Sequence, residues 1–140
     1  MQVKNNKIIL TEKQEHLLFV KYLRLHNILF HHSANEMRIQ NKENVKWNMI
    51  RVNMGMSAGF PDFIIFMKGY LLCIEMKRLY GVPSALSIVQ RDWIENLNKY
   101  DYILAGWCKG YDDAVNVIEY GKFENYKYNT KLICEVMNEK

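Results

Sequence analysis

The chain has 140 residues, of which 49% are hydrophobic and 24% are charged, and its formal net charge is +4. Such a chain can bury the core of one domain without disulfides, and it has no apolar run long enough for a membrane span or a secretory signal. Its three cysteines are far apart and form no CxxC pair, which predicts a reduced cytoplasmic protein, and its positive charge permits binding to a polyanion.

The first predicted element is a helix over residues 12–26, which Thr11 caps. Its apolar residues recur at helical spacing: Leu17, Leu18, Phe19, Val20, Tyr22, Leu23 and Leu25. A short strand is predicted over 27–32, NILFHH, and a second helix over 42–55 that ends near Gly55.

A hairpin is predicted next, with strands over 62–67 and 70–77 and the pair Lys68 and Gly69 as its turn. Glycine can take the positive φ that such a tight turn requires. Both strands are rich in Phe, Ile and Leu, yet ionisable residues stand near the start of the first and the end of the second. Because an apolar core does not accommodate unpaired charges, this hairpin is the first candidate for a functional site.

Three elements complete the predicted order. A helix over 87–100 is capped by Ser87, a strand covers 102–107, and a short helix over 112–121 has an acidic start and a glycine end. The first of these helices has a predicted apolar set of Ile88, Trp93, Ile94 and Leu97. The tail from Lys122 is ambiguous. The order α-β-α-β-β-α-β-α predicts an α/β fold with a central mixed β-sheet flanked by helices.

The register of the hairpin brings its ionisable residues together. With a two-residue turn, Asp62 faces Glu75 across the ladder, with Cβ atoms roughly 5 Å apart, and Lys77 lies on the same face as Glu75. A cation held by both carboxylates, a main-chain carbonyl and waters would relieve their repulsion, and oxygen ligands suit Mg²⁺. Lys77 would then orient a water or stabilise charge on a phosphate, as metal-assisted phosphodiester hydrolysis requires. The alternative is structural, with Lys77 in a salt bridge to Glu75 and Asp62 capping a turn after Pro61.

The segments GFPDFIIF and CIEMK resemble the signature of the PD-(D/E)xK nucleases. The ordered set that carries the likeness is Asn35, Gly59, Pro61, Asp62, Glu75, Lys77, Gln90 and Trp93. The stretches TEKQEHLLFVKYLRLHNILFHHSANE and MGMSAGFPD are similar to the VRR-NUC branch of this superfamily. The likeness covers Thr11 to about Tyr120. It therefore implies one VRR-NUC nuclease domain over 1–140, with its core over about 11–120 and a tail over 121–140 that contacts DNA or a second subunit.

This resemblance implies a restriction-endonuclease-like fold and DNA cleavage that depends on Mg²⁺, for which Mn²⁺ can substitute. It implies that Asp62, Glu75 and the main-chain carbonyl of Met76 bind the metal. It also implies that Lys77 is the catalytic lysine and that Gln90 supports the site. The expected cofactor is therefore a divalent cation, and the expected substrate is DNA.

Members of this family commonly add an acidic ligand from the first helix. Glu12 and Glu15 are both candidates, and His16 lies four residues after Glu12 on the same helix face. For either acid, the alternative is a solvated carboxylate that interacts favourably with the helix dipole.

Several residues outside the hairpin are weaker candidates for DNA contact: Asn35, Arg78 and His32. The pair His31 and His32 has no partners at zinc-ligand spacing, and histidine at a strand end is usually a polar edge residue. Trp93 is expected in the core rather than on a base-stacking platform.

Small stand-alone members of this branch resemble phage or mobile-element enzymes, and a phage enzyme would act in the host cytoplasm. The resemblance implies a homodimer acting on branched DNA such as a four-way (Holliday) junction, which is an argument by analogy. Two alternatives remain: a sequence-specific restriction-type endonuclease, and a non-catalytic nucleic-acid-binding module on the same fold.

Overall fold

The structure, a computed structural model, describes residues 2–4, 7–33, 55, 58–77 and 86–123. Several sequence predictions lie outside the described residues: Asn35, Arg78, nearly all of the second helix over 42–55, and the tail from 124 onward. Among the described helices, none is long and apolar enough to cross a membrane.

Helix α1 (Glu12–Leu25) begins where the sequence predicts, because Thr11 and Gln14 form a capping box. The hydroxyl of Thr11 accepts a hydrogen bond from the N–H of Gln14 (3.2 Å), and the Gln14 side chain accepts one from the N–H of Thr11 (2.9 Å). Two unsatisfied donors of the first turn are thereby paired.

The buried face of α1 is narrow. It consists of Glu15, Phe19 and Leu23, which follow one another at intervals of four residues. Three other residues of the predicted apolar set, Leu17, Leu18 and Leu25, are exposed, and Leu25 is 71% exposed. Apolar residues occupy most of the circumference of this helix, but only those on one face are buried by packing against the rest of the protein.

The main sheet has four strands in the order β3-β4-β5-β6. These strands are β3 (Phe30–His32), β4 (Phe63–Met67), β5 (Tyr70–Lys77) and β6 (Ile103–Lys109). The pairs β3–β4 and β4–β5 are antiparallel, whereas β5–β6 is parallel. The sheet is therefore mixed, as predicted.

The β4–β5 hairpin has the predicted register. Met67 pairs with Tyr70, and the pairing continues to Phe63 and Ile74. The turn residue Gly69 has a φ of 93°, which explains the need for glycine at this position. The next opposed positions beyond the ladder are those of the two acidic residues on which the sequence prediction depended.

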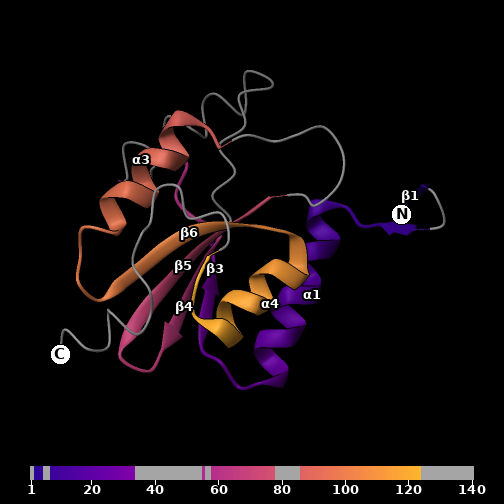
Figure 1. Ribbon diagram of the computed structural model, residues 1–140, viewed down its shortest axis with the longest axis horizontal. Helices are drawn as coiled ribbons and strands as arrows, with labels where there is room; N and C mark the ends of the chain where they lie inside the picture. The colour runs from indigo at the N-terminus through magenta and orange to yellow at the C-terminus, as the bar shows by residue number, and fades with distance from the viewer. Residues whose placement is uncertain (1, 5–6, 34–54, 56–57, 78–85, 124–140) are drawn as a thin grey trace.

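Helices cover both faces of the sheet (Figure 1). On one face, Leu72, Ile74 and Met76 of β5 join a core with α1 and with α4 (Gly110–Tyr120). On the other face, Cys73 joins a smaller core with Ile94 of α3 (Ile88–Leu97). The strict alternation along β5 places Glu75 and Lys77 on the α3 face of the sheet.

The two later helices differ in detail from their predictions. The N-cap of α3 is Ser87 as predicted, but Ile88 is 75% exposed and does not belong to the buried set. Helix α4 begins at Gly110, two residues before the predicted start, and ends before Gly121, whose φ is 72°. That left-handed glycine is the predicted helix stop.

A second, two-stranded sheet precedes α1 and was not predicted. It pairs β1 (Gln2–Lys4) with β2 (Lys7–Ile9) in antiparallel register. Figure 1 shows that this short hairpin extends away from the main sheet and its helices.

Candidate metal centre

Asp62 stands at the entrance to β4, and its backbone and side chain have different partners. Its carbonyl oxygen accepts a hydrogen bond from the N–H of Ser33 (2.7 Å), which continues the pairing with β3. Its carboxylate reaches the other neighbouring strand, where Oδ2 accepts from the N–H of Met76 (2.9 Å). Asp62 is therefore held at the end of β5 by hydrogen bonds on both sides.

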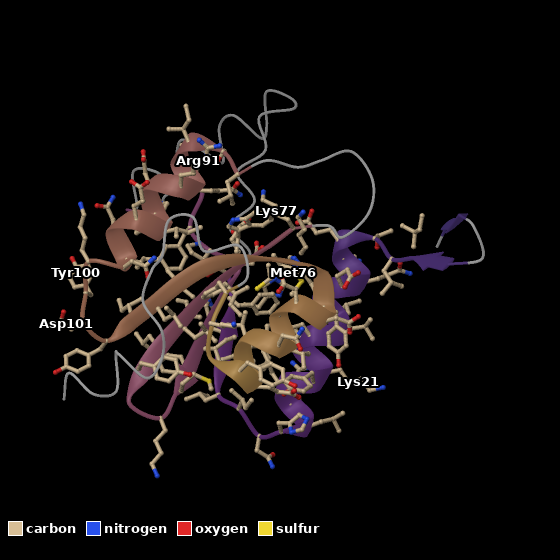
Figure 2. The ribbon with its side chains drawn as sticks, in the orientation of Figure 1. Lys21, Met76, Lys77, Arg91, Tyr100 and Asp101 are labelled. Carbon is tan, nitrogen blue, oxygen red and sulfur yellow. The ribbon has the colours of Figure 1, made fainter. Side chains whose placement is uncertain are left out.

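Glu75 and Lys77 contact each other and a glutamine of α3. The Nζ of Lys77 lies 3.7 Å from Oε1 of Glu75, and the same oxygen accepts a 2.7 Å hydrogen bond from Nε2 of Gln90. Lys77 also donates to Oε1 of Gln90 (2.9 Å). Figure 2 shows Lys77 at the end of β5 beside the start of α3. Gln90 thus bridges the carboxylate and the ammonium group.

The position of Gln90 is fixed by the start of α3. Its side-chain oxygen accepts from the N–H of Ser87 (2.9 Å), and its own N–H donates to the Ser87 hydroxyl (3.2 Å). This capping box leaves the Gln90 amide group little freedom to rotate. The helix cap and the candidate site therefore share one side chain.

Glu75 is buried and the neighbouring Asp62 is partly buried, which favours the protonated forms of both carboxyl groups. Burial raises the pKa of Glu75 to about 8, and the nearby charge of Asp62 adds to the rise. Burial also raises the pKa of Asp62 to about 6, against the hydrogen bond from Met76 that lowers it. Lys77 opposes the shift of both groups. A further positive charge would stabilise both carboxylates.

Helix α1 contributes a second acid and an imidazole to this region. The Nε2 of His16 lies 3.8 Å from Oε1 of Glu12 and 3.7 Å from Oδ2 of Asp62. One potential ligand atom from each of these three residues lies within 4.8 Å of the others. The spacing of Glu12 and His16 places them on one helix face, but the histidine is not among the site residues predicted from the sequence.

Glu12 and Glu15, which the sequence left as alternatives, occupy different environments. Glu15 is buried, and its Oε2 accepts a short hydrogen bond from the N–H of Tyr111 in the first turn of α4. A carboxylate at a helix N-terminus interacts favourably with the helix dipole and its free N–H groups. Glu15 therefore joins α1 to α4, and Glu12 is the acid that lies beside Asp62.

The donor atoms at the end of β5 suit a hard divalent cation. Asp62, Glu75 and Glu12 offer carboxylate oxygens. In an extended strand the N–H and C=O of one residue point to the same neighbouring strand, so the Met76 carbonyl is directed to the side where its N–H meets Asp62. Oxygen donors of this kind are typical of Mg²⁺ and Mn²⁺ sites.

His32, a weaker candidate for DNA contact, lies at the edge of this group. Its ring stacks on Phe63 with centroids 4.3 Å apart and meets His16 edge-on at 5.1 Å. His32 is exposed. It is close enough to Asp62 for its charge to lower the pKa of that carboxyl group.

Gly59 lets the segment before Asp62 approach the start of α3. Its φ is 80°, and a Cβ atom there would lie 2.7 Å from Cγ1 of Val89 and 3.1 Å from the backbone N of Gln90. We expect Gly59→Ala to lower the free energy of unfolding by about 1–3 kcal/mol, through backbone strain and overpacking. Gly55→Ala is the matched control, because Gly55 also has a positive φ (86°), but no atom of the residues that the structure describes lies within 4 Å of the added Cβ. Equal losses in urea unfolding would show that the contact with α3 contributes nothing.

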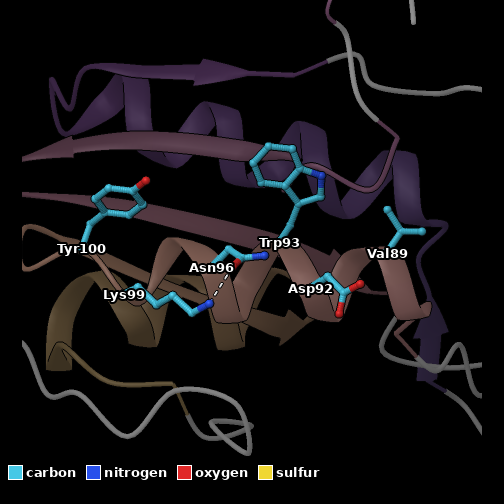
Figure 3. A pocket seen from close by; sticks show the side chains of 6 residues that line it. All are labelled: Val89, Asp92, Trp93, Asn96, Lys99 and Tyr100. Atoms are coloured by element: carbon cyan, nitrogen blue, oxygen red, sulfur yellow. Dashed lines mark hydrogen bonds between the residues drawn. The ribbon is translucent and has the colours of Figure 1, made fainter.

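A separate hollow of about 400 Å³ lies along α3 (Figure 3). It is lined by Val89, Asp92, Trp93, Asn96, Lys99 and Tyr100, none of which belongs to the acidic cluster. Trp93 is half-buried and not part of the core, which corrects the sequence prediction. Its indole N–H donates to the carbonyl of Ala58 (3.1 Å), and its ring meets Phe60 edge-on at 4.9 Å.

The mixed sheet, the helices on both faces and the acidic hairpin define an α/β protein with a restriction-endonuclease-like fold. Its structure is similar to a solved protein described as a VRR_NUC domain protein, with a TM-score of 0.59 and 26% sequence identity. The match covers 84% of this chain and 96% of that chain. No protein-family model and no curated protein matches the sequence. The structural likeness supports the assignment to the VRR-NUC family that the motifs indicated, and hence a nuclease-type domain.

Proposed function

We propose that this protein is a metal-dependent DNA endonuclease that hydrolyses phosphodiester bonds. The observation that carries the proposal is the cluster at the end of β5, where Asp62, Glu75 and Lys77 are gathered by the hydrogen bonds of Met76 and Gln90. A salt bridge alone would need one acid and one base. Here one lysine faces two acids, the buried Glu75 and the partly buried Asp62, and the raised pKa values of both favour a further bound cation.

The metal ligands and Lys77 have different roles in the proposed hydrolysis. Asp62, Glu75 and the Met76 carbonyl would hold Mg²⁺ or Mn²⁺, with Glu12 as a further ligand. When bound, such a cation acts as a Lewis acid toward the phosphate. Lys77 supplies a fixed positive charge for the oxygens that become more negative during hydrolysis, and it can orient the attacking water.

Gln90 acts on this chemistry through Lys77. Its side-chain oxygen holds the ammonium group at 2.9 Å, and its amide N–H occupies one oxygen of Glu75. The lysine is therefore fixed before substrate arrives, which lowers the reorganisation that the reaction needs. Hydrolysis adds water across one P–O bond and leaves a phosphate end and a hydroxyl end.

The preferred substrate in this proposal is branched DNA, such as a four-way junction, cut by a homodimer with two active sites. This choice follows from the resemblance to small stand-alone VRR-NUC enzymes. His32, Asn35 and Arg78 are the proposed DNA contacts. Alternative functions on the same fold are a sequence-specific restriction-type endonuclease and a non-catalytic nucleic-acid-binding module.

The test is a cleavage assay with the full chain on a supercoiled plasmid, a linear duplex and a four-way junction, in Mg²⁺, Mn²⁺ or EDTA. We expect cuts with either cation, none with EDTA, and faster cleavage of the junction than of the duplex. Sedimentation of the protein with the junction should give two chains per DNA. DNA binding without cuts in any buffer would favour the non-catalytic module, and cuts at one fixed duplex sequence would favour the restriction-type enzyme.

A further inference from the structure

We infer that His16 is a metal ligand, and that Glu12, His16 and Asp62 form a mixed nitrogen–oxygen site that favours Mn²⁺ over Mg²⁺. The inference deepens the proposed function and depends on it only for the presence of a cation at Asp62. The imidazole nitrogen of His16 would join the oxygen donors at the end of β5 as a ligand of different chemistry. The consequence concerns which cation the centre selects.

The distances among the three residues are close to those of a ligand set. Two ligands at about 2.1–2.2 Å from one ion, at right angles to each other, lie about 3.0 Å apart, and wider angles give larger separations. The Nε2 of His16 lies 3.8 Å from one carboxylate oxygen and 3.7 Å from the other. Shifts of a few tenths of an ångström in the side chains of Glu12 and Asp62 would close the set around an ion.

The imidazole ring of His16 is already held in one orientation. It meets the buried ring of Phe63 edge-on with centroids 5.4 Å apart, and it meets His32 edge-on at 5.1 Å. Its side chain is 13% exposed, whereas that of Glu12 is 53% exposed. Nε2 therefore stays directed at Asp62, and Glu12 is the ligand that can move onto the ion.

The position of Asp62 links this site to the acids at the end of β5. Its Oδ2 lies near His16 and also accepts from the N–H of Met76. A cation bound by His16 would consequently lie against the Asp62 carboxylate that Met76 also holds at the end of β5. The fixed position of α1 is maintained by the hydrogen bond between Glu15 and Tyr111.

The donor types determine the selectivity. Mg²⁺ demands near-ideal oxygen coordination and gives up its waters reluctantly, whereas imidazole suits transition metals. A site with one imidazole and two carboxylates should consequently bind Mn²⁺ more tightly than Mg²⁺. A simple ion pair would instead place a protonated imidazole between two carboxylates, where no bond from nitrogen to a metal can form.

The test is Mn²⁺ binding by the full chain, followed by electron spin echo envelope modulation, which detects an imidazole nitrogen bonded to Mn²⁺. The variant is His16→Gln, which keeps an oxygen donor but removes the imidazole. The matched control is His31→Gln, because His31 is an exposed histidine on β3 that belongs to no described ligand group. Calorimetric titrations with Mn²⁺ and Mg²⁺ give the selectivity, and thermal melting checks that each variant folds.

We expect nitrogen modulation in the wild type and in His31→Gln, and its loss in His16→Gln. The ratio of Mn²⁺ to Mg²⁺ affinity should fall about tenfold or more in His16→Gln. Wild-type protein that binds Mn²⁺ without nitrogen modulation, or binds no Mn²⁺, would overturn the inference. The cleavage assay separates the two proposals: cuts by a centre without nitrogen modulation refute only the role of His16, and nitrogen-bound Mn²⁺ without cuts refutes only the nuclease.

Discussion

Lys77→Met is expected to reduce metal-dependent DNA cleavage by about 10²–10³-fold while leaving cation binding nearly unchanged. Methionine keeps an apolar stem of similar length but removes the charge that Gln90 holds in place at 2.9 Å. If that charge acts on the phosphate, its loss lowers the rate of hydrolysis and not the affinity for the cation. Single-turnover cleavage at saturating Mg²⁺ and calorimetric titration with Mg²⁺ measure the two effects separately.

Two further variants sharpen this prediction. Lys21→Met removes an exposed lysine on the outer side of α1, away from Lys77 (Figure 2), and should cleave like the wild type. Asp62→Asn should lose both cation binding and cleavage, because the carboxylate is the proposed ligand. Wild-type rates in folded Lys77→Met would remove the lysine from the reaction, and wild-type rates in Asp62→Asn would remove the metal role of that acid.

The hairpin and its cluster could be predicted because their geometry is local. A two-residue turn at Lys68 and Gly69 fixes every pair of the β4–β5 ladder, and alternation along the strand fixes the faces. The positions of Asp62 and Glu75, one step beyond the last pair of the ladder, therefore face each other because of the turn alone. The capping residues Thr11 and Ser87 were predictable for the same reason, since each cap involves only the next three residues.

The choice between Glu12 and Glu15 could not be made from the sequence. Both stand in the first turn of α1, and only two residues separate them. Which of them meets the sheet depends on how α1 rotates against α4, and that rotation is set by contacts between distant segments, such as Glu15 with Tyr111. A helix with apolar residues on most of its surface gives no periodic signal for this choice.

The ligand role that we infer for His16 cannot be predicted from the sequence alone, because an acid and a histidine four residues apart on a helix are common. This spacing indicates a ligand group only in the folded protein, where Asp62 lies beside His16. Asp62 is 46 positions further along the chain than His16, at the entrance to β4. The partial exposure of Trp93 was missed for a related reason, because its partners Phe60 and Ala58 lie in the segment before β4. Helical spacing alone cannot show such contacts.

The raised pKa values of Glu75 and Asp62 predict that the metal-free protein loses stability as the pH rises. Burial raises the pKa of the Glu75 carboxyl to about 8 in the native protein, from the ordinary value of 4.5 that applies to the unfolded chain. Between these values the native state binds more protons than the unfolded state, so the free energy of unfolding falls with increasing pH. Asp62, with its pKa raised from 3.8 to about 6, contributes in the same direction over a lower range.

Glu75→Gln should therefore be more stable than the metal-free wild type at pH 8, by about 1–3 kcal/mol, given about 1.4 kcal/mol for each unit of pKa shift. The glutamine side chain keeps an oxygen that can accept from Nε2 of Gln90, so the hydrogen bond at 2.7 Å need not be lost. At pH 4, where the wild-type carboxyl is protonated in both states, the difference should nearly vanish. Urea unfolding in EDTA from pH 4 to 9 measures it.

Added Mg²⁺ should reverse the order of stability at pH 8, because a bound cation stabilises the charged form of Glu75 and binds only the folded site. The wild type should gain stability with Mg²⁺, whereas Glu75→Gln should gain much less and should not cleave DNA. Glu95→Gln, which removes an exposed acid of α3, serves as the control and should follow the wild type at every pH. If the pH profile of unfolding free energy in EDTA were the same for the wild type and Glu75→Gln, ionisation of Glu75 would not destabilise the native protein. The cluster would then require no cation.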